Sequence, residues 1–310
     1  MAFELIQPLR VAATSIAVIG AGAAVALQGQ LALAGACDRS TSNSFKACYV
    51  DAGSSYQYAV AMCANIKDLT TKQNCQTRAA DDQTSAQKLC DRQQAARKDV
   101  CAALGQSPYD PTIRPKDFSA KITNPLMPLT SGDVRVYKNG QATVTVMVTD
   151  QTIQLLGVTC LIVRDMNVVN GAIEEDTFDY YAQDRAGNVW YFGEDTIAYN
   201  KGIASTEGSW RAGVNGAKPG IIMFADPQLG QTYRQEFMLG NAEDLAKTVA
   251  FNQHVKVPYG AFTNAFETLE FTPLEPGAKE NKFYVRNVGE VLSIDLDTGE
   301  HEELVSFTHR

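Results

Sequence analysis

Six cysteines between residues 37 and 101 place the strongest constraint on how this 310-residue chain can fold. Their successive spacings are 11, 15, 12, 15 and 11 residues, which read the same in both directions. Spacings of 11 and 15 are close to three and four turns of an α-helix at about 3.6 residues per turn, so each arm carries its cysteines on one stripe. The symmetric pairs are Cys37 with Cys101, Cys48 with Cys90, and Cys63 with Cys75. The pattern predicts a helical hairpin over residues 37–104 with three nested disulfides.

The composition of this segment agrees with two helices. It lacks proline and is rich in Ala, Gln, Lys, Arg and Asp, with a turn expected near Lys67–Thr70. It holds no histidine and no C-x-x-C pair, so a metal or haem site is not favoured. Two roles stay open for the hairpin: a projecting module for a protein partner, or a small cap on the rest of the protein.

The N-terminal residues 1–36 read as a secretory signal peptide. Arg10 precedes the apolar run Val11–Ala36, and both Ala32–Ala34 and Ala34–Ala36 suit signal peptidase. The alternative is an uncleaved anchor, which two glutamines near the end of the run weaken. Disulfides form in oxidising compartments, so we expect a periplasmic or secreted protein with no membrane span in the mature chain.

Two cysteines need separate comment. Leu33–Cys37 resembles a lipoprotein cleavage site, but Ala34 stands where leucine is usual, so we expect Cys37 to form a disulfide and keep lipidation as the alternative. Cys160 is the seventh cysteine, and Val158 and Leu161–Val163 flank it. We expect it to be buried and inert, although the sequence leaves its role open.

Residues 105–117 form a linker with three prolines, and residues 118–310 form a β-domain. Short β-branched runs with near-neighbour turns predict a mainly antiparallel sheet, curved into a half-barrel or barrel-like meander. A short helix is expected at Ala242–Val249. The fold class is therefore α+β, with a disulfide-stapled helical hairpin before the sheet.

The stretch Asp176–Asp195 predicts the central hairpin of the sheet. Aromatic and β-branched residues flank Asp184–Asn188, where Asp184 suits the start of a type I turn and Gly187 suits its positive-φ position. The aromatics fall on both faces of the hairpin. One face is expected to pack on the core, and the other to line a cleft or lie under a loop.

Charge and motifs exclude several function classes. The chain carries a net charge of −8; residues 37–104 have nine Lys or Arg against seven Asp and residues 1–36 are neutral, so residues 105–310 carry −10. An acidic domain without a basic stripe argues against a nucleic-acid partner. Gly20–Gly22 begins like a dinucleotide motif but lacks its third glycine, and only three histidines are present. No cofactor and no metal are expected.

Three segments together resemble an uncharacterised family of secreted bacterial β-rich proteins with a Cys-rich helical N-terminal segment. They are Tyr109–Ile113 with Ile122–Leu129, the YYAQDRAGNVWYFGED stretch, and Gly208–Trp210 with Pro219–Gly220 and Gly230–Glu236. The resemblance covers about residues 90–300. It implies an extracytoplasmic curved β-sheet and supplies no catalytic residues.

Function is expected to be binding without catalysis. The aromatic side chains suited to line a cleft for a lipid-like, glycan or peptide ligand are Trp190, Tyr191, Trp210 and Tyr233. A Gly-rich loop over residues 202–220 is expected to act as a lid. The alternative is a carboxylate-based hydrolase or lyase acting on an extracellular polymer. Its weak candidate catalytic residues are Glu194, Asp195, Glu207 and Glu236.

Overall fold

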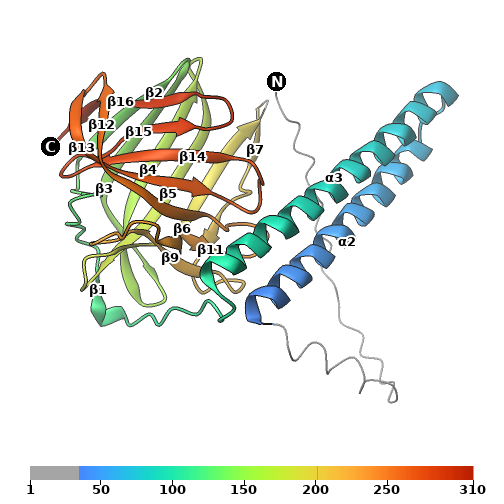
Figure 1. Cartoon of the computed structure of the whole chain (residues 1–310). Coiled ribbons are helices and arrows are strands. Elements are labelled where there is room, and N and C mark those ends of the chain that lie inside the picture. Colours follow the sequence, from blue (N-terminus) through green and yellow to red (C-terminus); the bar gives the residue numbers. More distant parts are fainter. Residues whose placement is uncertain (1–34, 201, 310) are drawn as a thin grey trace. The chain divides into compact units, whose positions relative to one another are not determined.

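The computed structural model of the protein describes residues 35–200 and 202–309 (Figure 1). The chain divides into two compact units, one ending at Pro108 and one running from Tyr109 to the C-terminus. The predicted signal sequence, up to its last two residues, lies outside the described residues. In the described ranges no helix carries an apolar stretch long enough to cross a bilayer.

The first unit is a pair of helices, α2 (Ala36–Ala64) and α3 (Leu69–Leu104), joined by a turn at residues 65–68. The Asp68 side chain caps α3 by accepting a hydrogen bond from the backbone N–H of Thr71 at 2.7 Å. Disulfides join Cys37 to Cys101, Cys48 to Cys90 and Cys63 to Cys75, with Cα–Cα distances of 5.6, 5.8 and 5.7 Å. The nested pairing predicted from the cysteine spacing is confirmed.

The helical pair has little apolar core apart from these cysteines. Its other buried apolar side chains are Ala52, Ala79 and Val100, all of them small. Such side chains bury little apolar surface, so they contribute little hydrophobic stabilisation. The disulfides therefore carry much of the cohesion of this unit, and they indicate an oxidising environment.

The second unit is a large antiparallel sheet that follows a short 3-10 helix, η1 (Pro115–Asp117). Its strands are β1 (Phe118–Ser119), β2 (Val134–Asn139), β3 (Ala142–Leu155), β4 (Val158–Val169), β5 (Ala172–Asp184), β6 (Val189–Asn200), β7 (Ile203–Ser205), β8 (Trp210–Arg211), β9 (Lys218–Met223), β10 (Thr232–Arg234), β11 (Glu236–Phe237), β12 (Leu245–Val257), β13 (Gly260–Phe271), β14 (Lys279–Val285), β15 (Gly289–Asp295) and β16 (His301–Thr308).

The sheet curves into a nearly closed, barrel-like shape (Figure 1). The C-terminal strand β16 pairs with β2, the first long strand. At the other end, β10 pairs with β12 and β11 pairs with β9. Only Gln235 separates β10 from β11, so one short kinked segment links both edges of the sheet. The predicted barrel-like meander is confirmed.

The β5–β6 hairpin has the turn that the sequence predicts. The backbone N–H of Gly187 donates to the carbonyl oxygen of Asp184 at 3.0 Å, and Gly187 has φ +90°. On one face Phe118 packs edge-on against Trp190 and Phe192, with ring centroids 5.8 and 5.5 Å apart. The opposite face carries Tyr191 towards the barrel interior. The hairpin is thus covered on its outer face and open to the interior on the other.

The helix predicted at Ala242–Val249 is wrong. Residues from Leu245 onwards form β12, in which Leu245 pairs with Phe271 and Ala246 with Glu270. Alanine and leucine are good helix formers, but intrinsic helix propensity amounts to less than about 1 kcal/mol per residue, and pairing with a neighbouring strand overrides it. The Gly-rich stretch 202–220 is likewise not one open loop, because it contains β7, β8 and the start of β9.

Candidate functional site

A cavity of about 250 Å³ lies beside Tyr191 inside the barrel-like unit. We call it the Tyr191 cavity. It is lined mainly by polar and charged side chains from β6, β11, β13 and β14 and the segment before β12. The ones that matter for its chemistry are Tyr191, Gln235, Glu236, Asp244, Glu270, Glu280 and Lys282. Carboxylates outnumber cations in this lining, so the cavity is acidic.

Tyr191 sits between two carboxyl groups. Its hydroxyl oxygen lies 2.6 Å from Asp179 Oδ1 and 3.0 Å from Glu194 Oε2. A hydroxyl has one proton to donate, so both contacts are hydrogen bonds only when one carboxyl group carries a proton of its own. Burial raises the pKa of Glu194 to about 7 and that of Asp179 well above its usual range. Burial therefore favours the protonated form of both carboxyl groups beside Tyr191.

Glu236 and Asp244 form a second close pair of acids. The backbone N–H of Asp244 approaches Glu236 Oε1 at 3.4 Å, and both side chains line the Tyr191 cavity. Burial, followed by repulsion from Asp244, raises the pKa of Glu236 well above its usual range. Burial also raises the pKa of Asp244. Two like charges this close resist joint ionisation, so the pair has the character of one acid and one base.

Lys282 is the cation that balances the opposite wall. Its Nζ lies 3.4 Å from Glu270 Oε2 and 3.1 Å from Glu280 Oε1. Thr268 and Tyr284 donate to Glu270 at 3.0 and 3.1 Å, and Ser293 donates to Glu280 at 2.7 Å. Burial alone would lower the pKa of Lys282, but the two carboxylates outweigh it and raise that pKa well above its usual range. The charged groups of this wall therefore have hydrogen-bond and ion-pair partners within the protein.

Gln235 is the least satisfied polar group of the cavity. The side chain is 3% exposed, and its Nε2 has no hydrogen-bond partner among the residues that the structure describes. Its backbone N–H donates to the carbonyl oxygen of Asp244 at 2.9 Å, which fixes it where the sheet closes. A buried amide N–H without a partner costs about 1–3 kcal/mol. The cavity therefore offers a hydrogen-bond donor to a bound group.

Of the four aromatics predicted to line a cleft, the structure places only Tyr191 in the lining of this cavity. Trp190 packs under Phe118, and its indole N–H donates to Asp184 Oδ2 at 2.8 Å. Trp210 is buried edge-on against Tyr191, with ring centroids 5.4 Å apart. Tyr233 is buried against Phe224 at 4.9 Å. These three side chains therefore serve packing and do not line the cavity.

The four candidate catalytic carboxylates also differ in whether they reach the cavity. Glu236 lines the cavity, and Glu194 reaches it through Tyr191. Asp195 instead forms a bidentate ion pair with Arg211, and its pKa is lowered by that hydrogen bond. Glu207 is exposed.

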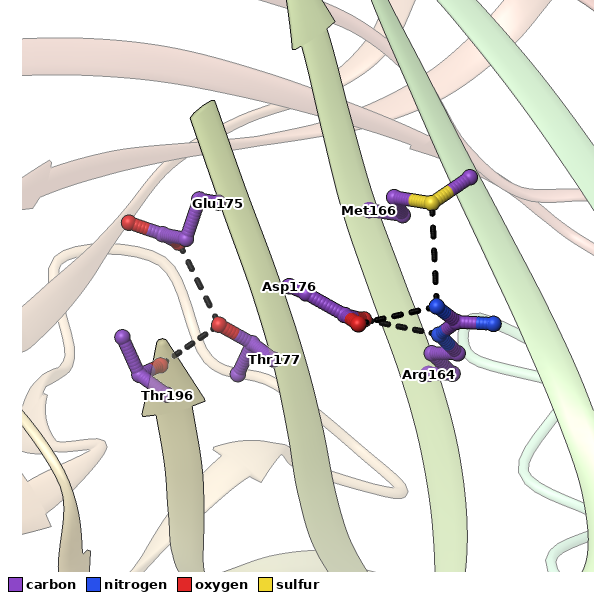
Figure 2. A network of polar contacts seen from close by, with 6 residues as sticks. All are labelled: Arg164, Met166, Glu175, Asp176, Thr177 and Thr196. Carbon is purple, nitrogen blue, oxygen red and sulfur yellow. Dashed lines mark hydrogen bonds and ion pairs between the residues drawn. The ribbon is translucent and has the colours of Figure 1, made fainter. Parts of the chain in front are cut away.

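The sequence reasoning missed Gln235, Asp244, Glu270 and Lys282. The stretch containing Glu270 alternates polar with apolar residues, which usually places the polar residues in solvent. In this unit part of the interior is polar, so the polar set faces inward. Two further groups of polar contacts lie along β4–β6 in Figure 2: Thr177 with Thr196 and Glu175, and Arg164 with Asp176 and Met166.

The two groups in Figure 2 lie on opposite faces of the sheet. Asp176 and Thr177 are successive residues of β5, and successive side chains of a strand point to opposite faces. Thr177 Oγ1 lies 2.5 Å from Thr196 Oγ1 on the inner face. Arg164 binds both oxygens of Asp176 at 2.7 and 2.8 Å on the outer face. The outer ion pair stabilises the sheet and does not reach the cavity.

Comparisons with protein-family models, with curated proteins and with solved structures find no match. In the described ranges no group of three His, Cys, Asp or Glu side chains is arranged to hold a metal ion. Cys160 is buried without a disulfide partner, and burial raises the pKa of its thiol to about 12. We therefore infer function from the Tyr191 cavity.

Proposed function

We propose that this is a periplasmic or secreted protein that binds a glycan without catalysis, taking a sugar unit into the Tyr191 cavity. This location is supported by the three nested disulfides of α2 and α3 (the disulfide ladder), by the predicted signal peptide and by the resemblance to secreted bacterial β-rich proteins. Of the three ligand classes expected from the sequence, a lipid-like ligand suits this lining least, because alkyl groups would leave the buried carboxyl groups without partners.

One observation carries the choice of a glycan. The unpartnered N–H of Gln235 needs an acceptor, while the carboxyl groups of Glu236 and Asp244, which line the same cavity, can accept further hydrogen bonds. A sugar hydroxyl both donates and accepts, so neighbouring hydroxyls satisfy an amide and a carboxylate together. Tyr191 adds an aromatic surface. The cavity volume of about 250 Å³ is close to the lower end of the range for small-molecule sites, roughly 300 Å³, which fits a single sugar unit.

Titration calorimetry with a panel of mono- and disaccharides tests this proposal. We expect Gln235→Leu to lower the affinity for the tightest-binding saccharide about tenfold, because a hydrogen bond to a buried group is lost. Gln151→Leu, at an exposed position of β3, is the matched control and should bind like the wild type. Failure of every saccharide to bind the wild type, or equal affinity in the two variants, would contradict the proposal.

The second candidate function is a hydrolase or lyase acting on an extracellular polymer. The Glu236–Asp244 pair favours it, because two adjacent carboxyl groups with raised pKa values can act as general acid and general base. We expect Glu236→Gln and Asp244→Asn to abolish any cleavage of a polysaccharide while ligand binding persists. Glu207→Gln is the exposed control. Full activity in both cavity variants removes the pair as catalytic residues.

A further inference from the structure

A second cavity of about 210 Å³ lies inside the same unit, and we call it the Arg135 cavity. It shares Ile222, Glu270 and Lys282 with the Tyr191 cavity, but the rest of its lining is different. Arg135 stands at one side, and Asp165, Glu290 and Glu302 stand at another. The lining also includes the acid Asp179 and four apolar side chains of β3 and of the segment before β2: Met127, Leu129, Val144 and Val146.

Arg135 is buried, and the described residues give its guanidinium no ion pair. Its Nε donates to the carbonyl oxygen of Val288 at 2.9 Å and its Nη2 to that of Pro128 at 2.8 Å. The guanidinium lies 4.1 Å from the centre of the Phe307 ring. The side chain is 3% exposed, and its Nη1 has no partner in the part of the chain that the structure describes. A buried guanidinium with an unpaired N–H is a binding group for a carboxylate.

The acidic side of the Arg135 cavity is suited to bind a positively charged group. Asp165, Glu290 and Glu302 line it, and burial followed by repulsion among acidic groups raises the pKa of Asp165 to about 7. Burial also raises the pKa of Glu290 to about 8. Lys282 opposes this rise in both pKa values, but its Nζ is held between Glu270 and Glu280, and the pKa values stay raised. A further positive charge would stabilise these carboxylates in their ionised form.

The sheet register sets the spacing between Arg135 and one of these acids, Asp165. Val146 of β3 pairs with Arg135 of β2 and also with Asp165 of β4. Cross-strand partners share one face, so all three residues face the interior. Two strand spacings separate the backbones of Arg135 and Asp165, which is about 10 Å. Side chains reaching in from both positions leave room for a short ligand with opposite charges at its ends.

A ligand of a single charge does not suit this cavity. A simple cation would be repelled by Arg135, and a simple anion would be repelled by the ionised acids. We infer that the Arg135 cavity binds an α-amino acid with an aliphatic side chain. Its carboxylate accepts from Arg135 Nη1, its ammonium group faces Asp165, Glu290 and Glu302, and its side chain packs on Val144 and Val146. The inference does not depend on glycan binding in the Tyr191 cavity.

Titration calorimetry on the intact, disulfide-bonded protein tests this with three related compounds. L-leucine has both charges, leucinamide lacks the carboxylate, and 4-methylpentanoate lacks the amine. We expect leucine to bind and each analogue to bind at least about tenfold more weakly, since each loses a charge-assisted contact. No binding of leucine at millimolar concentration, or equal affinity for leucine and leucinamide, overturns the inference.

Variants add a test that keeps the protein folded. Replacing Arg135 would break its bonds to Val288 and Pro128, so Glu302→Gln is the better choice, because no hydrogen bond to its side chain is present among the described residues. Glu302→Gln should weaken the binding of leucine several-fold and leave the affinity for 4-methylpentanoate unchanged. Glu303→Gln, the neighbouring residue on the opposite face, should change neither. Gln235→Leu should also leave leucine binding unchanged; a parallel loss there, or unchanged leucine binding in Glu302→Gln, contradicts the inference.

Discussion

Gly220 of β9 passes directly against the backbone of Gln235, the residue at which the sheet closes. A Cβ atom at position 220 would overlap the carbonyl group of Gln235 and lie 2.6 Å from the carbonyl oxygen of Arg234. Only glycine allows this approach. Because the side chain of Gln235 lines the Tyr191 cavity, one close backbone contact determines both the closure of the sheet and the position of a binding group.

Gly220→Ala is therefore expected to destabilise the β-unit. The added methyl group meets backbone atoms, which cannot rotate away, so the cost should be about 1–3 kcal/mol. Urea unfolding followed by tryptophan fluorescence measures the change. Gly53→Ala is the control: an added Cβ there has no atom within 4 Å, and alanine favours helix, so stability should stay the same or rise. Equal stability of Gly220→Ala and the wild type would contradict the close approach.

The buried acids predict that the protein is more stable at pH 5 than at pH 8. Burial raises the pKa of Asp165 and Glu194 to about 7 and that of Glu290 to about 8. Between the unfolded pKa values, near 4, and these folded values, the folded protein binds more protons than the unfolded chain. The free energy of unfolding therefore falls as pH rises through this interval, by at most about 1.4 kcal/mol per pH unit and group, and levels off above it.

Urea titrations at intervals from pH 5 to pH 8.5 measure this slope. Carboxyl groups with lowered pKa values, such as Asp195 and Glu280, act below about pH 4 and do not contribute in this range. Glu290→Gln should flatten the slope between pH 5 and 8, whereas exposed Glu207→Gln should leave it unchanged. A stability that stays constant across the interval would contradict the prediction, because it would show that these acids are already ionised in the folded protein.

Cys160 is expected to be the single free thiol of the protein and to be unreactive while the protein is folded. It is fully buried, and burial raises its pKa to about 12, so almost no thiolate is present at pH 8. A thiol reagent such as DTNB should titrate no thiol in the native protein and one in guanidinium. Rapid reaction of the native protein would show that this part of the core opens.

The cysteine spacing predicted the helical hairpin because helical periodicity and disulfide pairing impose the same register. The Asp184–Asn188 turn was also predictable, since few residues suit its positive-φ position. By contrast, the expected helix at Ala242–Val249 failed because weak local preference lost to pairing between β12 and β13. Preferences of a short stretch of sequence predict its structure correctly where no pairing with a distant strand competes with them.

The site was harder to predict than the fold. Trp190, Trp210 and Tyr233 fit a binding cleft by residue type, but their neighbours decide that they pack in the walls. Gln235 and Lys282 carry no motif, and they become informative only when the sheet places them in the interior. Whether a polar side chain of a curved sheet faces the interior or the solvent depends on which face of the sheet lies inside, and alternation alone does not reveal that.

The disulfide ladder gives the last prediction. Cys37 is bonded to Cys101, which leaves no thiol at Cys37 for a lipid anchor. Non-reducing peptide mapping of the purified protein should recover the pairs 37–101, 48–90 and 63–75. A diacylglyceryl group on Cys37, or any crossed pairing, would contradict the ladder.

Removing the outer disulfide tests its contribution. In a Cys37→Ser, Cys101→Ser double variant the bridge between Cys48 and Cys90 remains, so only the outer ends of α2 and α3 gain freedom. In the chain-entropy picture this costs about 3 kcal/mol, less than the roughly 4 kcal/mol for closing the whole loop alone. Hydrogen exchange should show the amides of residues 36–47 and 91–104 losing protection while residues 49–89 keep theirs. Uniform loss of protection along both helices would mean that the three disulfides act as one cooperative unit.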